Sequence, residues 1–322
     1  MKYQYLFGPV PSRRLGISLG VDLVPFKTCT LNCIYCECGL TTDLTLKRKE
    51  YVPFEKVIKE IKDYMDQNPP PDYITFSGSG EPLLNSRFGE VARFIKVNYP
   101  DIKLALLTNG TLLSREGILK EVSHCDVVLP SLDGPDEETF KKMNKPHGDL
   151  KFEDVKEGLL KLKKSFKGEI WLEVFLAEGI NTDTETLKKF KVLLEKLSPK
   201  RIQLNTLDRP PAVEGIKPVS KEKLYEIREY FGMENVEIIS KFKSRKEIKS
   251  YRKDTESAIL DTIKRRPCTV VDLSHILGIH INEVNKYLDV LEKENKIDTE
   301  IRERGVFVKG TVVDKVDKRD TK

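Results

Sequence analysis

The sequence has no long apolar run, and none of its apolar stretches approaches the roughly 20 residues that a membrane-spanning helix needs. Its opening, MKYQYLFGPVPSRR, lacks the apolar stretch and the small-residue cleavage site of a secretory signal. An internal repeat at the period of a solenoid is also absent. These absences predict a cytoplasmic globular protein with no membrane partner.

The sequence also lacks a large excess of one charge sign: it has 56 basic and 51 acidic residues, and its net charge is +5. A balance this close to neutral does not by itself identify a nucleic-acid-binding protein. Histidine is scarce, with four residues, and only His147 lies in a segment expected near a ligand. The sequence therefore assigns no general acid or base.

Short apolar segments alternate with amphipathic ones through the first 240 residues. Each predicted strand is bounded by Gly, Pro, Asn or Asp, and the six strands are 16–24, 73–77, 103–108, 127–131, 170–176 and 201–205. Helical patterns lie at 54–66, 86–97, 114–123, 152–165, 184–197 and 220–230. Such repeated units favour a parallel sheet, either open and doubly wound or a partial barrel. Because a complete eight-stranded barrel needs about 250 residues, the predicted fold class is α/β, a partial (β/α)6 TIM-type barrel over residues 1–240.

The chain changes character after residue 240. A basic linker is predicted over 241–254, where KFKSRKEIKSYRK holds seven basic residues and one acidic residue. Three helices (255–266, 270–277 and 281–294) and two short strands around Arg304 and Gly305 then resemble a winged helix-turn-helix domain over 255–310, followed by a charged tail, 311–322. The helix over 281–294 carries two basic and four acidic residues, which favours substrate delivery or protein contact over DNA binding. The basic linker is the better candidate for contact with RNA.

Four of the six cysteines fall within ten residues, in KTCTLNCIYCECG. Cys29, Cys33 and Cys36 have the spacing C-x3-C-x2-C, and three thiolates leave one iron of a four-iron cluster without a protein ligand. That iron can then bind a small molecule while electrons arrive through the cluster. A zinc site with Cys38 as the fourth ligand is the alternative, but zinc sites usually pair two C-x2-C units, and a second such pair is absent. Cys125 and Cys268 are expected to be buried apolar residues.

The cysteine spacing, with an aromatic residue (Tyr35) before the last cysteine, resembles the radical S-adenosylmethionine (SAM) superfamily. The resemblance extends over roughly residues 8–210. It implies a [4Fe–4S] cluster held by Cys29, Cys33 and Cys36, SAM as a second cofactor, and Tyr35 against the SAM adenine. The opening segment, FGPVPSRRLGISLGVD, is similar to a subgroup related to the wybutosine-synthesis enzymes of tRNA.

Further candidate SAM contacts follow the predicted strands, at the strand ends where ligands bind in parallel α/β folds. The second strand leads into Gly78, Ser79, Gly80 and Glu81, which looks like the Gly-Gly-Glu motif that binds the SAM amino group in the family, with Ser79 in place of one glycine. In the same resemblance, the ends of the third and fourth strands line the SAM ribose and carboxylate through Thr108, Asn109, Ser131 and Asp133.

The segment WLEVFL places Trp171, Glu173 and Phe175 on one strand face. A carboxylate on an inner face needs a cation or a ligand. Glu173 is therefore expected either to face SAM or substrate, or to pair with a lysine outside the barrel. Gln203 and Asn205 share a face of the next strand and are candidate substrate contacts. Arg14, beside Arg13 in the opening segment, is a candidate ligand for an anionic group.

The resemblance implies that the protein cleaves SAM reductively and makes a 5′-deoxyadenosyl radical, which abstracts hydrogen from a substrate. An external one-electron donor, ferredoxin or flavodoxin, is the implied partner. The substrate is not specified by the sequence, although tRNA or a protein is favoured. The alternative function is an iron–sulfur redox-sensing transcription regulator with the winged helix as its output. A regulator has no need of Gly78–Glu81 or of six strand–helix units, so the enzyme is the preferred interpretation.

Overall fold

The computed structural model describes residues 3–12, 14–36, 38–207, 211–239, 255–278, 284, 287–288, 291–292, 294–302 and 305–311. The chain divides into two compact units, Met1–Lys246 and Glu247–Lys322. The predicted basic linker over 241–254 and nearly all of the predicted tail over 311–322 lie outside the described residues.

The first unit is built on one mostly parallel sheet of eight strands, in the order β1-β2-β5-β6-β7-β8-β9-β10. All six predicted strands are confirmed, with small shifts at their ends: β2 (Gly16–Val21), β5 (Tyr73–Phe76), β6 (Lys103–Thr108), β7 (Val127–Pro130), β8 (Glu169–Leu176) and β9 (Arg201–Thr206). Each pairs in parallel with its neighbour. The sheet therefore confirms the α/β class.

The prediction of six strands was incomplete, because the sheet carries one more strand at each edge. The antiparallel strand β1 (Leu6–Ser12) pairs with β2, and its register is interrupted between Phe7 and Val10. Its two prolines, Pro9 and Pro11, hide it from a sequence reading, since proline lacks a backbone N–H and is confined to edge strands. The parallel strand β10 (Val236–Ile238) is only three residues long.

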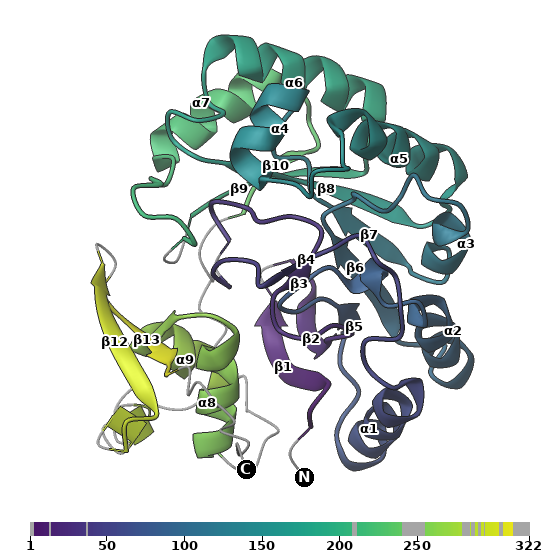
Figure 1. The fold of residues 1–322 in the computed structure, drawn as a ribbon, viewed down its shortest axis with the longest axis vertical. Coiled ribbons are helices and arrows are strands. Elements are labelled where there is room, and N and C mark those ends of the chain that lie inside the picture. Colours follow the sequence, from purple (N-terminus) through teal and green to yellow (C-terminus); the bar gives the residue numbers. More distant parts are fainter. Residues whose placement is uncertain are drawn as a thin grey trace, which may run out of the picture. The chain divides into compact units, whose positions relative to one another are not determined.

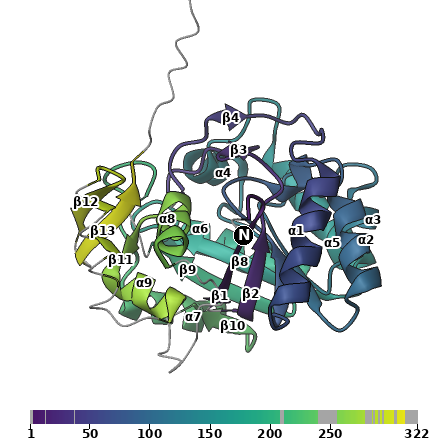
Figure 2. The ribbon, with the colours of Figure 1, turned by 90° about the horizontal axis from the view of Figure 1, so that it is seen from below.

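Helices cover the convex face of this sheet (Figures 1 and 2). The helices of this unit are α1 (Phe54–Gln67), α2 (Phe88–Asn98), α3 (Ile118–Val122), α4 (Glu137–Asn144), α5 (Phe152–Ser165), α6 (Thr184–Leu197) and α7 (Lys221–Phe231), with a short 3-10 helix, η1 (Pro82–Leu84). The predicted helices of this unit are confirmed, although α3 occupies only the second half of the predicted 114–123, and α4 is an addition. It is short and polar, and it begins where the Asp136 side chain accepts a hydrogen bond from Thr139 N at 2.8 Å.

The strands divide their side chains between two faces. Leu104, Leu106, Val128, Leu172 and Val174 belong to the large core cluster that the strands share with the helices. The alternate positions form a separate inner cluster of Leu15, Ala105, Val127, Leu129 and Trp171. The prediction that Trp171 and Glu173 share a face opposite Leu172 and Val174 is thus confirmed, and that face is the inner one.

The second unit contains α8 (Thr255–Arg265), β11 (Cys268–Thr269), α9 (Val270–Leu277), β12 (Ile297–Arg302) and β13 (Gly305–Gly310). Its three strands form an antiparallel sheet in the order β11-β13-β12, which confirms the two predicted C-terminal strands. Most of the third predicted helix, over 281–294, lies outside the described residues, as does Arg304. Among the described helices of both units, none combines the length and apolarity that crossing a membrane requires.

Candidate functional site

The cysteine motif lies on a loop that follows β2 and begins with the two-residue strand β3 (Thr28–Cys29), on the concave side of the sheet in Figure 1. This strand pairs in parallel with β4 (Asp43–Leu44), and Cys29 O accepts a hydrogen bond from Thr45 N at 3.0 Å. A turn follows, closed by Cys36 N donating to Cys33 O at 3.2 Å. We name residues 26–45 the cysteine loop.

The C-terminal end of α4 and the residues after it hold the cysteine loop from its other side. Ile34 N donates to Met143 O at 3.0 Å, Asn32 N donates to Asn144 O at 3.0 Å, and His147 N donates to Thr30 O at 3.0 Å. Residues 143–147 therefore run alongside residues 30–34. His147 lies near the site, as predicted, and contributes its backbone N–H group to it.

The three cysteines have different electrostatic surroundings. Burial, together with the nearby Glu81 carboxylate, raises the pKa of Cys29 to about 11. Burial also raises the pKa of Cys33 well above its ordinary value, with the nearby Cys36 adding to the effect. In contrast, a hydrogen bond with Cys38 and the charge of Lys27 lower the pKa of Cys36 to about 5. These contacts favour the thiolate form of Cys36, the form that binds metal.

Glu81 is a buried carboxylate that ties two strand ends together. It is 1% exposed and accepts hydrogen bonds from Thr108 Oγ1 at 2.8 Å, Asn109 N at 2.8 Å and Leu83 N at 3.1 Å. Burial raises the pKa of Glu81 to about 7, and these hydrogen bonds oppose the rise. The carboxylate that follows β5 thus fixes the end of β6 beside it.

The glycines before Glu81 let the chain pass close to the cysteine loop. A Cβ atom on Gly80 would lie 2.0 Å from Thr28 O, and one on Gly78 would lie 2.3 Å from the Asp22 carboxyl carbon. Ser79, between them, donates from its backbone N at 3.3 Å and from Oγ at 3.2 Å to Asp22 Oδ2. In this structure Gly80 therefore permits a close approach to the backbone at Thr28, and Gly78 permits a close approach to Asp22.

Asn109 links the end of β6 directly to the cysteine loop. Its Nδ2 donates to Thr30 Oγ1 at 2.8 Å and lies 3.5 Å from Cys29 Sγ. Because Glu81 holds the Asn109 backbone, the carboxylate and the cysteine are connected through one residue.

Tyr35 and Asp133 form the centre of a second group of contacts. The Tyr35 ring stacks on Phe175 with centroids 3.9 Å apart and planes inclined by 14°. Its hydroxyl donates to Asp133, which also accepts from Asn144 Nδ2 at 2.9 Å and from Phe175 N at 3.1 Å. Burial raises the pKa of Asp133 to about 6, and these hydrogen bonds limit the rise.

Ser131 lies beside this group, at the end of β7. Its backbone N donates to Thr108 O at 3.0 Å, so the ends of β6 and β7 are joined there. Ser131 also lines a small cavity together with Asn109, Asp133 and Asn144. The residues predicted to follow β5, β6 and β7 are thus brought together around the cysteine loop.

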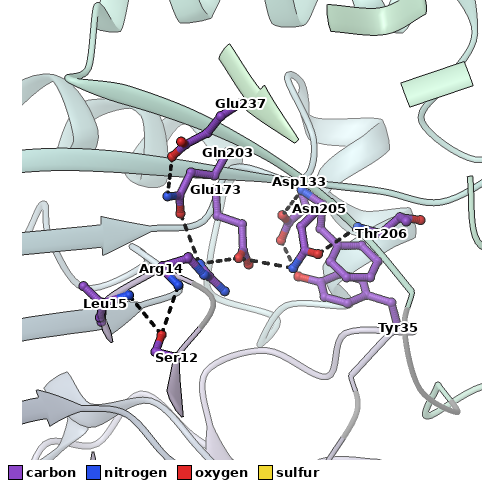
Figure 3. A network of polar contacts seen from close by, with 11 residues as sticks. Ser12, Arg14, Leu15, Tyr35, Asp133, Glu173, Gln203, Asn205, Thr206 and Glu237 are labelled. Carbon is purple, nitrogen blue, oxygen red and sulfur yellow. Dashed lines mark hydrogen bonds and ion pairs between the residues drawn. The ribbon is translucent and has the colours of Figure 1, made fainter. Parts of the chain in front are cut away.

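Glu173 belongs to a polar network that crosses the inner face (Figure 3). Arg14 Nη1 lies 2.6 Å from Glu173 Oε2 and donates to Gln203 Oε1 at 3.4 Å. Asn205 Nδ2 donates to the same Glu173 oxygen at 3.4 Å. Of the two alternatives for Glu173, the outer lysine partner is wrong: the carboxylate faces inward and pairs with Arg14.

The sequence reading missed two residues of the site, Lys27 and Asn144. Lys27 is 3% exposed, and its Nζ lies 3.1 Å from Cys36 Sγ. Asn144, the last residue of α4, is 2% exposed and places Nδ2 at 3.3 Å from Cys33 Sγ. The position of Lys27, two residues before the first cysteine, was an available signal, but nothing local to Asn144 marks it.

The family model of the radical SAM superfamily matches residues 23–190, which include the cysteine loop and the strands from β5 to β8. The chain belongs to the radical SAM superfamily. Its cofactors are accordingly a [4Fe–4S] cluster and SAM. The eight-stranded, mostly parallel sheet is typical of the partial barrel of radical SAM enzymes.

Curated relatives carry different names. A protein named GTPase Obg from Brachyspira hyodysenteriae is 36% identical over 306 residues, which are 94% of this chain and 44% of that protein, so the chain spans less than half of that relative. A UPF0026 protein from Methanocaldococcus jannaschii is 31% identical over 293 residues, 89% of each chain. This radical SAM chain is therefore also a member of the UPF0026 family.

The fold is shared with solved radical SAM structures. A structure of TYW1 with a bound lysine–pyruvate adduct is 17% identical, with a TM-score of 0.51, and the match covers 70% of this chain and 75% of TYW1. At this identity the likeness shows the fold alone.

The described residues of this radical SAM chain fit a cubic cluster. Three thiols, on Cys29, Cys33 and Cys36, come from one loop, and Cys36 lies close enough to raise the pKa of both Cys29 and Cys33. Among the described residues, no three His, Cys, Asp or Glu side chains are grouped tightly enough for a single metal ion. The donors that the loop offers are thiols, the ligands that hold iron–sulfur clusters in proteins.

Proposed function

We propose that Cys29, Cys33 and Cys36 hold the [4Fe–4S] cluster, that SAM binds to the remaining iron, and that the chain is an enzyme that abstracts hydrogen from a substrate. The observation that carries this proposal is the gathering of Asn109, Asn144 and Lys27 directly around the three cysteine sulfurs. Polar side chains from separate parts of the fold meet at one loop that the family model covers. When bound, the cluster and SAM supply a 5′-deoxyadenosyl radical by reductive cleavage of SAM.

Most of the SAM-binding residues in this proposal follow the carboxyl ends of adjacent parallel strands, where ligands bind in such folds, while Tyr35 lies in the cysteine loop and Glu173 within β8. The full set is Tyr35, Gly78, Ser79, Gly80, Glu81, Thr108, Asn109, Ser131, Asp133 and Glu173. Their contacts support different tasks. Glu81, which already accepts three hydrogen bonds, positions Thr108 and Asn109, while Tyr35 is held in a fixed orientation by Phe175 and Asp133.

The chain also excludes water from the reacting region. Ile34, Met143, Phe175, Ala177 and Leu207 form a buried apolar cluster, and Tyr35 packs against it. A radical that meets water or a stray side chain is lost, so an apolar wall beside the cofactor protects the reaction.

The proposed substrate site is the inner face beside Arg14, Glu173 and Asn205 (Figure 3). The side chains there are polar and paired, so the matching substrate carries hydrogen-bonding groups. A macromolecule, tRNA or protein, is favoured because of the second unit, which we assign as a winged-helix module. The order α8, β11, α9, β12, β13 and the placement of β11 beside β13 support that assignment. Ferredoxin or flavodoxin supplies the electron.

The test is SAM cleavage by oxygen-free protein reconstituted with iron and sulfide and reduced with dithionite. The wild-type chain is expected to form 5′-deoxyadenosine. Cys33→Ala is expected to lose the cluster spectrum and to lower 5′-deoxyadenosine formation by more than about a hundredfold, because two thiolates do not retain the cluster. Cys125→Ala is the matched control, since Cys125 is a buried thiol between α3 and β7, outside the cysteine loop.

Two results would contradict the proposal. Wild-type protein that holds a cluster but forms no 5′-deoxyadenosine would favour the iron–sulfur regulator. Equal loss of SAM cleavage in Cys33→Ala and Cys125→Ala would mean that general instability, and not ligation, explains the effect.

A further inference from the structure

Each of the three cysteines lies next to the N–H group of one polar side chain. The contacts are Lys27 Nζ to Cys36 Sγ at 3.1 Å, Asn144 Nδ2 to Cys33 Sγ at 3.3 Å, and Asn109 Nδ2 to Cys29 Sγ at 3.5 Å. We propose that these three side chains, named here the donor set, raise the reduction potential of the bound cluster. This inference rests on the proposed function, because it needs the cluster on these cysteines.

Further hydrogen bonds of each amide orient the two asparagines. Asn109 Oδ1 accepts from Thr111 N at 3.1 Å and from Thr111 Oγ1 at 2.7 Å, which leaves its Nδ2 to face Cys29. Asn144 Nδ2 also donates to the Asp133 carboxylate at 2.9 Å, and a flipped amide would place two oxygens against each other. The N–H groups therefore face the sulfurs.

Asn144 is fixed by its donors alone. Its Oδ1 is buried, and no group of the described residues donates to it. A buried acceptor without a partner lowers stability. The contacts of its N–H groups with Asp133 and Cys33 therefore determine the position of the amide, and its oxygen contributes no hydrogen bond to that position.

Lys27 is held at the sulfur by its backbone. Its φ of 58° is in the left-handed region, its N donates to Ser79 O at 3.2 Å, and its O accepts from Thr42 N and Asp43 N at 3.1 Å each. Within the part of the chain that the structure describes, its ammonium contacts Cys36 Sγ and forms no ion pair with a carboxylate. A buried cation needs an anion nearby, and a thiolate-bound cluster supplies one.

The direction of the effect follows from charge. Reduction adds an electron to a cluster whose thiolates already make it negative, and the added charge spreads onto the sulfurs. N–H donors and a cation beside the sulfurs stabilise the reduced state more than the oxidised state, which raises the potential. The donor set therefore makes the cluster easier for its electron donor to reduce.

The test is a redox titration of the reconstituted full-length protein without SAM, followed by EPR of the reduced cluster. In Lys27→Met, the ratio of reduced to oxidised cluster at a fixed ambient potential is expected to fall about tenfold, which is about 59 mV for a one-electron couple. Lys27→Gln keeps a donor without the charge and should fall between Lys27→Met and the wild type. Asn144→Ala should lower the ratio by a smaller factor than Lys27→Met.

The matched control is Lys47→Met, which removes an exposed lysine close to the same loop and should leave the titration unchanged. Unchanged potentials in Lys27→Met, Lys27→Gln and Asn144→Ala with full iron content would overturn the inference, while SAM cleavage by those variants would leave the proposed function standing. Loss of the cluster from all three variants, with retention in Lys47→Met, would also overturn it, because the donor set would then serve assembly. Failure of the wild-type chain to bind a cluster would reject the proposed function itself.

Discussion

Glu81 has the most demanding environment of the carboxylates at the site. Its side chain is buried and its pKa is raised to about 7, so the folded protein holds a proton that an unfolded chain releases near 4.5. Three hydrogen-bond donors around it, two of them from Thr108 and Asn109, offset part of the cost of burying the carboxylate. Asp133 is a second such group, with burial raising its pKa to about 6.

The first prediction concerns pH. Between about pH 4.5 and pH 7 the folded state binds more protons than the unfolded state, so the free energy of unfolding should fall as pH rises through this range. The fall should be on the order of 2–3 kcal/mol for Glu81, and Asp133 adds to it in the same direction. Urea denaturation of iron-free protein at pH 5, 6 and 7 measures it.

Glu81→Gln should flatten this pH dependence to the part that Asp133 contributes, whatever its effect on the absolute stability. Glu116→Gln, at an exposed position, is the control and should keep the wild-type slope. A slope in Glu81→Gln equal to that of the wild type would show that Glu81 does not hold the proton.

At the scale of elements, the site depends on how closely the turn after β5 passes the cysteine loop. Gly80 is the point of contact, because a Cβ there would lie 2.0 Å from Thr28 O, directly before Cys29. The obstacle is backbone, which cannot rotate away as a side chain does. Glu81 N then donates to the same Thr28 O at 3.1 Å, so the approach is also a hydrogen-bonded one.

The second prediction is that Gly80→Ala lowers the free energy of unfolding by about 1–3 kcal/mol and lowers the iron content after reconstitution, because the cysteine loop is displaced. Iron analysis and urea denaturation measure the two effects. Gly148→Ala is the matched control: no atom lies within 4 Å of its added Cβ, so its effect should stay within about 0.5 kcal/mol. Full iron content and stability in Gly80→Ala would refute the prediction.

The hairpin of β1 and β2 adds a contact across the inner face. Arg14 lies between these strands in sequence, and it pairs with Glu173 on β8 and bonds Gln203 on β9 (Figure 3). Strands near opposite edges of the sheet are therefore joined by one side chain. Without this link the inward-facing Glu173 carboxylate would lose the cation that pairs with it.

At the scale of the whole molecule, the chain separates into a unit with the site and a unit without it. The residues of the large core cluster all lie between Tyr5 and Val236, and the cysteine loop lies within the same unit. The second unit has its own three-stranded sheet and its own buried residues, among them Ile259, Leu273 and Phe307. The cofactors are thus expected to depend on the first unit.

The third prediction is that a chain ending at Lys246 folds and keeps the cluster. Its thermal unfolding midpoint should lie within about 5 °C of the first transition of the full chain, since its core is complete. Absorption spectra and 5′-deoxyadenosine formation should match those of the full chain. A truncated chain that precipitates or binds no iron would show that the second unit is needed for the fold of the first.

Local patterns determined the regular elements and the type of site. Apolar alternation and turn residues located all six central strands, and the bounds of α5 and α6 agree with the pattern. The spacing of Cys29, Cys33 and Cys36 was enough to predict an iron–sulfur cluster. The strand and helix patterns and the cysteine spacing could all be recognised because each is contained in a short stretch of sequence. Edge strand β1 was not predicted because its prolines interrupt the strand pattern, and α4 was not predicted because it is short and polar.

What surrounds the sulfurs was decided only by the tertiary structure. Asn144 is 111 residues from Cys33 in sequence, and Arg14 is 189 residues from Gln203, so no local pattern connects them. The alternation of side chains along the strand placed Glu173 on one face with Trp171. Its partner, Arg14, is determined by the fold, which brings the turn between β1 and β2 within reach of β8. Sequence therefore determined which groups are available for chemistry, while the packing of distant elements determined which of them meet, because hydrogen bonds and ion pairs act only over a few ångströms.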